Sequence, residues 1–347
     1  MLPQCFRKWV ICVKSDFAYH ITKYFAEYLP LHIGASTNTC KSYRDTFIQL
    51  IIFVENTYRI APEKISLASI TDTVIEDFLF YLETSVSVGV STRNQRLAAI
   101  HSFFKYIQRK DLTLFSQCAA ILSIRFKKNP PPIMTYLSIQ ETEILMSIPD
   151  VTAKKGLRDL TVLAVLYESA ARVQELIDLT ASNLHISNGT PYIELRGKGN
   201  KLRKIPIVDG VADILKKYLS AYHIVNPKDV VFHNSQKKKL TRAGVQYIVD
   251  KYIKLARQQN QGMFLQNITN HSFRHSKAMH LLEAGVNLIY IRDFLGHSSV
   301  TTTEIYAKTN PEIKRKLLTE NNLLSAEGVQ FNADEKDELM DWLKNNL

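Results

Sequence analysis

Apolar residues recur every three or four positions from residue 16 to about residue 125, a spacing that predicts amphipathic helices. In the last of these helices, the positions expected to face the core include Leu97, Ile100 and Phe104. The second and third helices are preceded by residues whose side-chain oxygens can cap free backbone N–H groups. The expected helix starts are Asp16, Ser36 or Thr37, Thr71 or Asp72, and Ser91.

The helical pattern stops at residues 125–136, which read RFKKNPPPIMTY. Three consecutive prolines cannot continue a helix and favour an extended, semi-rigid chain. The amphipathic pattern returns at residues 335–347, which we expect to dock as a helix on their own domain or on a neighbouring subunit. The predicted organisation is a helical domain at 1–125, a basic Pro-rich linker at 126–136, a second domain at 137–320 and an acidic tail at 321–347.

The second domain mixes helical patterns with one β-hairpin. Ser138 to Glu141 have the form of a capping box, and the nearly all-apolar run from Leu157 to Ser169 predicts a buried helix. Residues alternate between apolar and polar around a Gly-Lys-Gly-Asn turn from Pro191 to Pro206, as expected for a hairpin. We therefore predict a mainly α fold with a small β-sheet in the second domain. Further helices are expected at 241–258, 270–284, 287–295 and 301–308.

Charge narrows the choice of partner. The formal net charge is +11, which favours nucleic acid, and no single amphipathic helix concentrates this charge as a membrane-binding helix would. No apolar run reaches the length of a membrane span, and no signal peptide is evident. The four cysteines form no C-x-x-C pair, so reduced thiols and a cytoplasmic protein are expected.

One stretch, residues 271–306, carries side chains suited to phosphoryl transfer. Arg274 offers paired donors for phosphate oxygens, and His271 and His297 can move protons near neutral pH. Tyr306 offers a hydroxyl that can act as a covalent nucleophile. Short helices can bring these four side chains to one point. A zinc site at His271 and His275 is disfavoured, because the acid of an HExxH motif is absent. His275 and His280 are expected to be packing or hydrogen-bonded residues.

This stretch resembles the tyrosine recombinase family of phage integrases and Xer-type enzymes. The matching motifs are His271-Ser-Phe-Arg274, Leu-Gly-His297 and Tyr306. The resemblance extends to a first catalytic arginine at Arg172 and a catalytic lysine at Lys198. It implies a helical core-binding domain followed by a mixed α/β catalytic domain. The family more often has Gly-Leu before the first arginine, where this chain has two alanines.

The resemblance also implies a role for each residue. Tyr306 would attack a DNA phosphodiester and form a 3′-phosphotyrosyl bond, with no cofactor and no metal ion. Arg172 and Arg274 would stabilise charge on the nonbridging oxygens, and His297 would add a hydrogen bond. An unperturbed tyrosine has a pKa near 10, so a base must take its proton, and we expect His271 to be that base. Lys198 would protonate the leaving 5′-oxygen.

Basic residues outside this set are candidates for DNA contacts. Any one of them alone is more typical of a solvated surface, but beside the catalytic motifs we expect them to contact phosphates or bases. They lie on the fourth helix, in the linker, on the hairpin and before the helix at 241. The candidates are Arg93, Arg96, Lys105, Lys127, Lys128, Lys201, Arg203, Lys239 and Arg242.

The expected function is site-specific DNA recombination by a simple integrase without an arm-binding domain. We expect a monomer in solution that forms a homotetramer on double-stranded recombination sites. The extended tail favours an enzyme encoded by a mobile element over Xer-type chromosome dimer resolution. Two further alternatives are a type IB topoisomerase-like enzyme and a catalytically dead DNA-binding protein, although the complete set of six catalytic residues disfavours the last.

Overall fold

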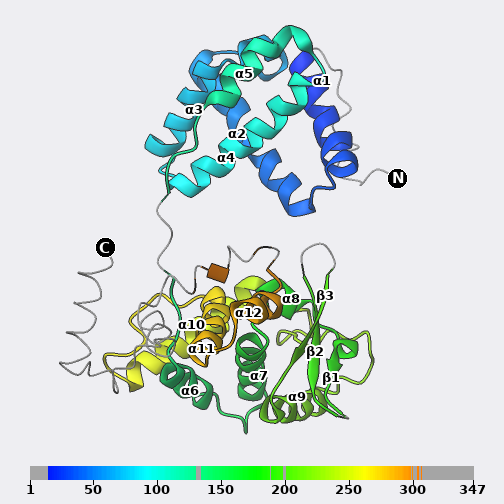
Figure 1. Ribbon diagram of the computed structural model, residues 1–347, viewed down its shortest axis with the longest axis vertical. Helices are drawn as coiled ribbons and strands as arrows, with labels where there is room; N and C mark the ends of the chain where they lie inside the picture. The colour runs from blue at the N-terminus through cyan, green and yellow to red at the C-terminus, as the bar shows by residue number, and fades with distance from the viewer. Residues whose placement is uncertain are drawn as a thin grey trace, which may run out of the picture. The chain divides into compact units, whose positions relative to one another are not determined.

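The chain forms two compact units, residues 1–132 and 133–347, in a computed structural model (Figure 1). The structure describes residues 15–129, 134–187, 189–197, 201–297, 299, 303, 304 and 306. Several predicted features fall outside these residues: the hairpin turn with Lys198, the linker prolines, most of the helix at 301–308, and the tail at 321–347.

The first unit is a bundle of helices, as predicted. Ser36 and Thr71 cap their helices by accepting hydrogen bonds from Thr39 N and Val74 N. The fourth helix begins one residue earlier than expected, because Gly89 and not a hydroxyl residue is its N-cap. A fifth helix was not predicted. The helices are α1 (Asp16–Lys23), continued by a π-helical segment (Tyr24–His32), α2 (Thr37–Tyr58), α3 (Asp72–Thr84), α4 (Val90–Gln108) and α5 (Phe115–Ser123).

Helix α4 is the centre of this unit and packs against α2, α3 and α5 (Figure 1). Its residues Leu97, Ile100 and Phe104 are buried as predicted. Aromatic rings fill much of the core: Phe103 makes edge-to-face contacts with Tyr24 at 5.2 Å and Phe47 at 5.1 Å between ring centroids. These contacts join the π-helical segment and α2 to α4, and aromatic pairs of this kind add to the stabilisation from burial itself.

The expected position of Arg93 on an exposed face of α4 is wrong. Arg93 is only 7% exposed, and its Nη1 donates to the carbonyl of Arg125 at 3.2 Å. Arg96 also turns inward, and its Nη1 donates to Ser42 O and Thr46 Oγ1, both at 3.2 Å. Both guanidinium groups donate to backbone carbonyls of other segments. The position of a residue around its own helix cannot predict such contacts. Lys105 is exposed as expected.

The second unit combines seven α-helices among its described residues with one small sheet. The predicted hairpin is present, and a short strand adds to it in the antiparallel order β1-β2-β3. Strand β1 and helices α8 and α9 were not predicted. The elements are α6 (Ile139–Ser147), α7 (Lys154–Glu168), α8 (Val173–Ile177), β1 (Leu184–His185), β2 (Tyr192–Arg196), β3 (Leu202–Pro206), α9 (Asp209–Tyr222), α10 (Arg242–Gln259), α11 (Asn270–Glu283) and α12 (Leu288–Leu295).

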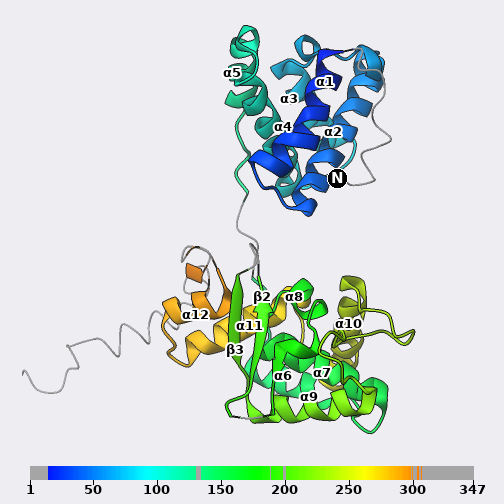
Figure 2. The same cartoon turned by 90° about the vertical axis from the view of Figure 1, so that its right-hand side faces the viewer.

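Helix α7 is the buried helix that its apolar run predicted. Leu163 and Leu166 are fully buried, and the helix packs against α9 and α11 (Figure 1). The hairpin pairs Ile193 with Ile205, both buried, and β2 lies next to α8 (Figure 2). This packing places the C-terminal end of α7, the start of α8 and the hairpin in one region. The predicted class, mainly α with a small β-sheet, is confirmed.

Helix ends in this unit follow the predicted capping chemistry. Ser138 and Glu141 form a reciprocal capping box, and Thr241 caps α10 by accepting from Gly244 N at 3.0 Å. Gly285 and Gly296 follow α11 and α12 with φ of 82° and 64°, the left-handed region that favours glycine. No helix of the described residues is long and apolar enough to cross a membrane.

Candidate active site

The turn between α7 and α8 positions Arg172. Ala170 in this turn has φ of 46°, a left-handed conformation that is costly for any residue with a Cβ. A glycine would adopt this conformation at lower cost, so Ala170 is a strained position two residues before Arg172. Arg172 is the N-cap of α8, and its side chain is 35% exposed.

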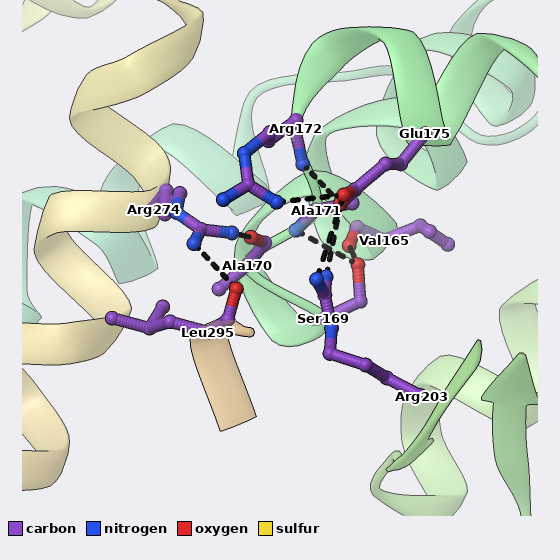
Figure 3. A network of polar contacts seen from close by, with 9 residues as sticks. All are labelled: Val165, Ser169, Ala170, Ala171, Arg172, Glu175, Arg203, Arg274 and Leu295. Carbon is purple, nitrogen blue, oxygen red and sulfur yellow. Dashed lines mark hydrogen bonds and ion pairs between the residues drawn. The ribbon is translucent and has the colours of Figure 1, made fainter. Parts of the chain in front are cut away.

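Glu175 is a buried carboxylate that binds two arginines (Figure 3). Its oxygens accept from Arg172 N at 2.9 Å, from Arg172 Nη1 at 2.8 Å and from Arg203 Nη2 at 2.9 Å. Burial raises the pKa of Glu175, but the hydrogen bond from the Arg172 backbone and the charge of Arg203 outweigh it, so the pKa lies below its usual value. Glu175 is therefore ionised and fixes the orientation of Arg172.

Arg203, expected to contact DNA, instead forms an ion pair with Glu175 in the structure. The side chain of Arg203 is only 10% exposed and is committed to Glu175. It also passes so close to Gly296 that a Cβ there would lie 2.2 Å from Arg203 Nη1. Arg203 thus connects strand β3 to the start of α8 and to the turn after α12. The run of cationic residues in the hairpin sequence does not indicate that Arg203 turns inward while nearby Lys201 is exposed.

Arg274 lies on α11 and is 4% exposed. It approaches the Ala170 turn from a different helix than Arg172 does (Figure 3), and its guanidinium donates to Ala170 O at 2.7 Å and to Leu295 O at 2.5 Å. Burial, together with the nearby charge of Arg172, lowers the pKa of Arg274 to about 10. Two cationic side chains from separate helices therefore converge at this turn, and Arg274 stays protonated at neutral pH.

His297 follows Gly296 in the turn after α12, as predicted. Its Nδ1 lies 3.0 Å from Thr303 Oγ1, and Thr303 is fully buried. Burial and the charges of Arg274 and Arg172 lower the pKa of His297 to about 4, so the ring is neutral at pH 7. A neutral imidazole whose Nδ1 is engaged by a hydroxyl retains Nε2 for a second hydrogen bond.

Tyr306 is buried, with 2% of its surface exposed, and its hydroxyl lies 3.1 Å from Nδ1 of His275. Its ring is parallel to that of His297, with 6.5 Å between centroids. Burial raises the pKa of Tyr306, while the charges of Arg274 and Arg172 lower it in part. Tyr306 was predicted from the sequence as the nucleophile, whereas only a packing or hydrogen-bonding role was predicted for His275.

His271, the expected partner of Tyr306, lies one turn earlier on α11 and is exposed. Within the described residues, the hydrogen bond of the Tyr306 hydroxyl is to His275 and not to His271. Partial desolvation and the charges of Arg274 and Arg172 lower the pKa of His271. His271 is therefore an exposed residue on which the charges of the same two arginines act.

The remaining basic candidates lie around this site or in the first unit. Lys239 pairs with Asp178, and Arg242 donates to Gln174 Oε1 at 2.9 Å, so both are anchored beside α8. Lys127 pairs with Glu83 in the first unit, at 2.7 Å, and Lys128 is exposed.

No group of three or more His, Cys, Asp or Glu side chains among the described residues could hold a metal ion. His280, which was predicted to be a packing or hydrogen-bonded residue, bonds to the Tyr167 hydroxyl at 2.8 Å and to Leu137 O at 2.9 Å.

The site as a whole has the features of a phosphoryl-transfer centre: a tyrosine hydroxyl, two arginines and several neutral histidines on four neighbouring segments. Comparison with known proteins agrees with this class. Residues 135–312 match the model of the phage integrase family, and residues 22–111 match the N-terminal SAM-like domain of phage integrases.

Curated relatives cover most of the chain. The putative integrase/recombinase y4rC of Sinorhizobium fredii is 30% identical over 315 residues, which are 91% of this chain and 94% of the relative. The tyrosine recombinase XerC of Syntrophus aciditrophicus is 30% identical over 296 residues, 82% of this chain and 92% of the relative. The chain belongs to the phage integrase family of tyrosine recombinases, enzymes that cleave and rejoin DNA.

Solved structures share the fold. The integrase of transposon Tn1549 in complex with transposon right end DNA superposes with a TM-score of 0.66 at 15% identity, covering 86% of this chain and 98% of that one. The XerH site-specific recombinase bound to its difH substrate, in a post-cleavage complex, gives 0.64 at 22% identity, covering 82% of this chain and 80% of that one. DNA is therefore the partner that this fold binds in its solved relatives.

Proposed function

We propose that this tyrosine recombinase cleaves DNA with Tyr306 as the nucleophile, leaving a 3′-phosphotyrosyl bond and a free 5′-hydroxyl. The observation that carries the proposal is the position of the Tyr306 hydroxyl, which is buried beside His275 and within the electrostatic influence of Arg172 and Arg274. A phosphodiester brought to these two arginines would meet the hydroxyl and the charge-stabilising donors in one place.

The two arginines would stabilise the negative charge that builds on the nonbridging oxygens. Arg172 keeps donors available, because its side chain is 35% exposed and its guanidinium donates to Glu175 through Nη1 alone. Arg274 contributes mainly charge, since two of its donors already bond to carbonyls. Nε2 of His297 supplies a further hydrogen bond, and Lys198 protonates the leaving 5′-oxygen.

The energy of the phosphodiester is conserved in the tyrosyl bond, so rejoining needs no ATP. A 5′-hydroxyl attacks the phosphotyrosine, the new phosphodiester forms and Tyr306 is released. This chemistry supports exchange of strands between two duplex sites. We expect the exchange to take place in a homotetramer assembled on DNA from monomers, in the cytoplasm, and in an enzyme of a mobile element.

The test uses Tyr306→Phe on a duplex that carries the recombination site and a nick that traps the covalent product. The variant should bind this duplex but form no adduct that survives denaturation, because only the nucleophilic oxygen is lost. Tyr290→Phe is the matched control, since Tyr290 is 71% exposed and lies on neighbouring helix α12, and it should form the adduct as the natural protein does. An adduct in Tyr306→Phe would contradict the assignment of the nucleophile.

The assembly is tested separately, with two duplex sites and the natural protein. Four-way junction intermediates on a gel would support recombination, whereas relaxation of a supercoiled plasmid without junctions would favour a topoisomerase-like activity.

A further inference from the structure

The hydroxyl of Tyr306 has a neighbour that the family motif does not assign. From the sequence, His271 is the residue expected to take the tyrosine proton. In the structure, the hydrogen bond of Tyr306 Oη is to Nδ1 of His275, at 3.1 Å. The two histidines are one helical turn apart on α11. Tertiary packing therefore decides which of them contacts Tyr306.

Building on the proposed function, we propose that His275 is the catalytic residue that accepts the Tyr306 proton during strand cleavage and returns it during rejoining. The proton moves from Oη to Nδ1 of His275 as the Oη–phosphorus bond forms and the bond from phosphorus to the 5′-oxygen breaks. The leaving oxygen receives a different proton, from the general acid. In rejoining, the deprotonated general acid takes the proton of the attacking 5′-hydroxyl. The bond from phosphorus to Oη breaks, and the His275 imidazolium gives its proton back to Tyr306.

Three features of the site suit His275 to this role. First, the donor and acceptor are already within the distance that a general base needs. Second, the environment keeps the imidazole neutral: burial, with the charges of His271 and Arg274, lowers the pKa of His275 to about 4. A neutral ring with its proton on Nε2 leaves Nδ1 free to accept.

Third, the ring geometry holds the pair together. The centroids of His275 and Tyr306 are 5.7 Å apart with an interplanar angle of 55°, so the rings are in contact and not only their polar atoms. His275 also follows Arg274 directly in the sequence, and Arg274 is fixed by its two bonds to carbonyls. The anchored arginine therefore sets the position of the base relative to the charge-stabilising group.

His271 has a different environment. It is exposed, and within the described residues the Tyr306 hydroxyl bonds to His275 and not to His271. Its position among Arg172, Arg274 and Arg242 fits a contact with phosphate oxygens instead. The two histidines of one helix would thus divide the work, one binding the phosphate and the other moving the proton.

The experiment compares His275→Asn with His271→Asn in single-turnover cleavage of the nicked duplex. Asparagine can place its carbonyl oxygen near the position of Nδ1, so it keeps a hydrogen-bond acceptor but takes up no proton. We expect His275→Asn to cleave about 100-fold or more slowly, the usual contribution of a general base. Binding of the duplex, measured in parallel, should be unchanged in His275→Asn, which shows that the variant folds.

The second arm replaces Tyr306 with a fluorinated tyrosine, whose more acidic phenol needs less help from a base. The substitution should restore cleavage in His275→Asn by a larger factor than it changes cleavage in the natural protein or in His271→Asn. A residue that only positions the ring would show no such difference, because fluorination changes acidity and leaves the hydrogen-bonding partner in place.

The outcomes are separable. Cleavage by His275→Asn at the natural rate or faster would overturn the proposal, and a faster rate would mean that His275 holds Tyr306 back. Larger rescue of His271→Asn would return the role of base to His271. If the natural protein forms no adduct through Tyr306, the proposed function fails, and this is seen with Tyr306→Phe before either histidine is changed.

Discussion

Glu175→Gln is the substitution that most directly tests how the active site is held together. The change keeps the shape of the side chain but removes its charge and one of its two acceptor oxygens. In the native site, that carboxylate accepts three bonds of 2.8–2.9 Å from Arg172 and Arg203 while 8% exposed. The glutamine NH₂ group would face a guanidinium group, donor against donor.

The magnitude follows from the burial of the pair. Removing one partner of a buried ion pair costs about 3–5 kcal/mol, because the other charge remains buried without a counter-charge. Arg203 is in that position, with a side chain only 10% exposed, whereas Arg172 can turn to solvent. Glutamine retains one acceptor, so we expect a loss at the lower end, about 3 kcal/mol of unfolding free energy for the second unit.

The assay is hydrogen exchange at increasing urea concentrations, followed peptide by peptide. With a urea dependence of about 1–3 kcal/mol per M, peptides from α7 and α10 should lose protection at least about 1 M earlier than in the natural protein. Peptides from α3, in the first unit, serve as an internal reference and should not shift.

Glu194→Gln is the matched control. Glu194 also loses a negative charge in the second unit, but its nearest ion-pair distances are 3.7 Å and 3.9 Å and its side chain is 20% exposed. Loose pairs of this kind contribute about 0–1 kcal/mol. Equal shifts in Glu175→Gln and Glu194→Gln, or an equal shift in α3, would refute the idea that Glu175 holds the two arginines.

Two further predictions follow from the same site. Gly296→Ala should reduce cleavage and stability more than Gly285→Ala. Both glycines have left-handed φ, but only at residue 296 would the new Cβ clash with Arg203. Similar losses in the two variants, measured by urea unfolding and adduct formation, would argue against that contact. Acid should destabilise the second unit between pH 6.5 and 4, since His275 and His297 have pKa values of about 4 when folded and take up protons at higher pH when unfolded. The slope is at most about 1.4 kcal/mol per pH unit for each histidine, stability being lost as pH falls, and His275→Asn should flatten it in urea titrations at several pH values.

Local chemistry made much of this protein predictable from its sequence. Helix ends at Ser36, Ser138 and Gly296 follow from hydrogen-bonding side chains and from a glycine that tolerates left-handed φ, and both are properties of a few neighbouring residues. The hairpin follows from alternation around a glycine-rich turn. The motif of Arg274, His297 and Tyr306 could be identified because its members lie on consecutive short segments and match the motif of a known family.

Tertiary structure decided the matters that depend on which way a side chain turns. Arg93 and Arg203 look like surface cations in the sequence, yet both side chains turn inward. The reason is that a carbonyl in one case and Glu175 in the other lie within reach only after folding. His271 and His275 differ by one helical turn, and α11 alone does not determine which faces Tyr306. That choice depends on how the turn after α12 and the segment with Tyr306 pack on α11, since contacts between distant segments have no local signature in the sequence.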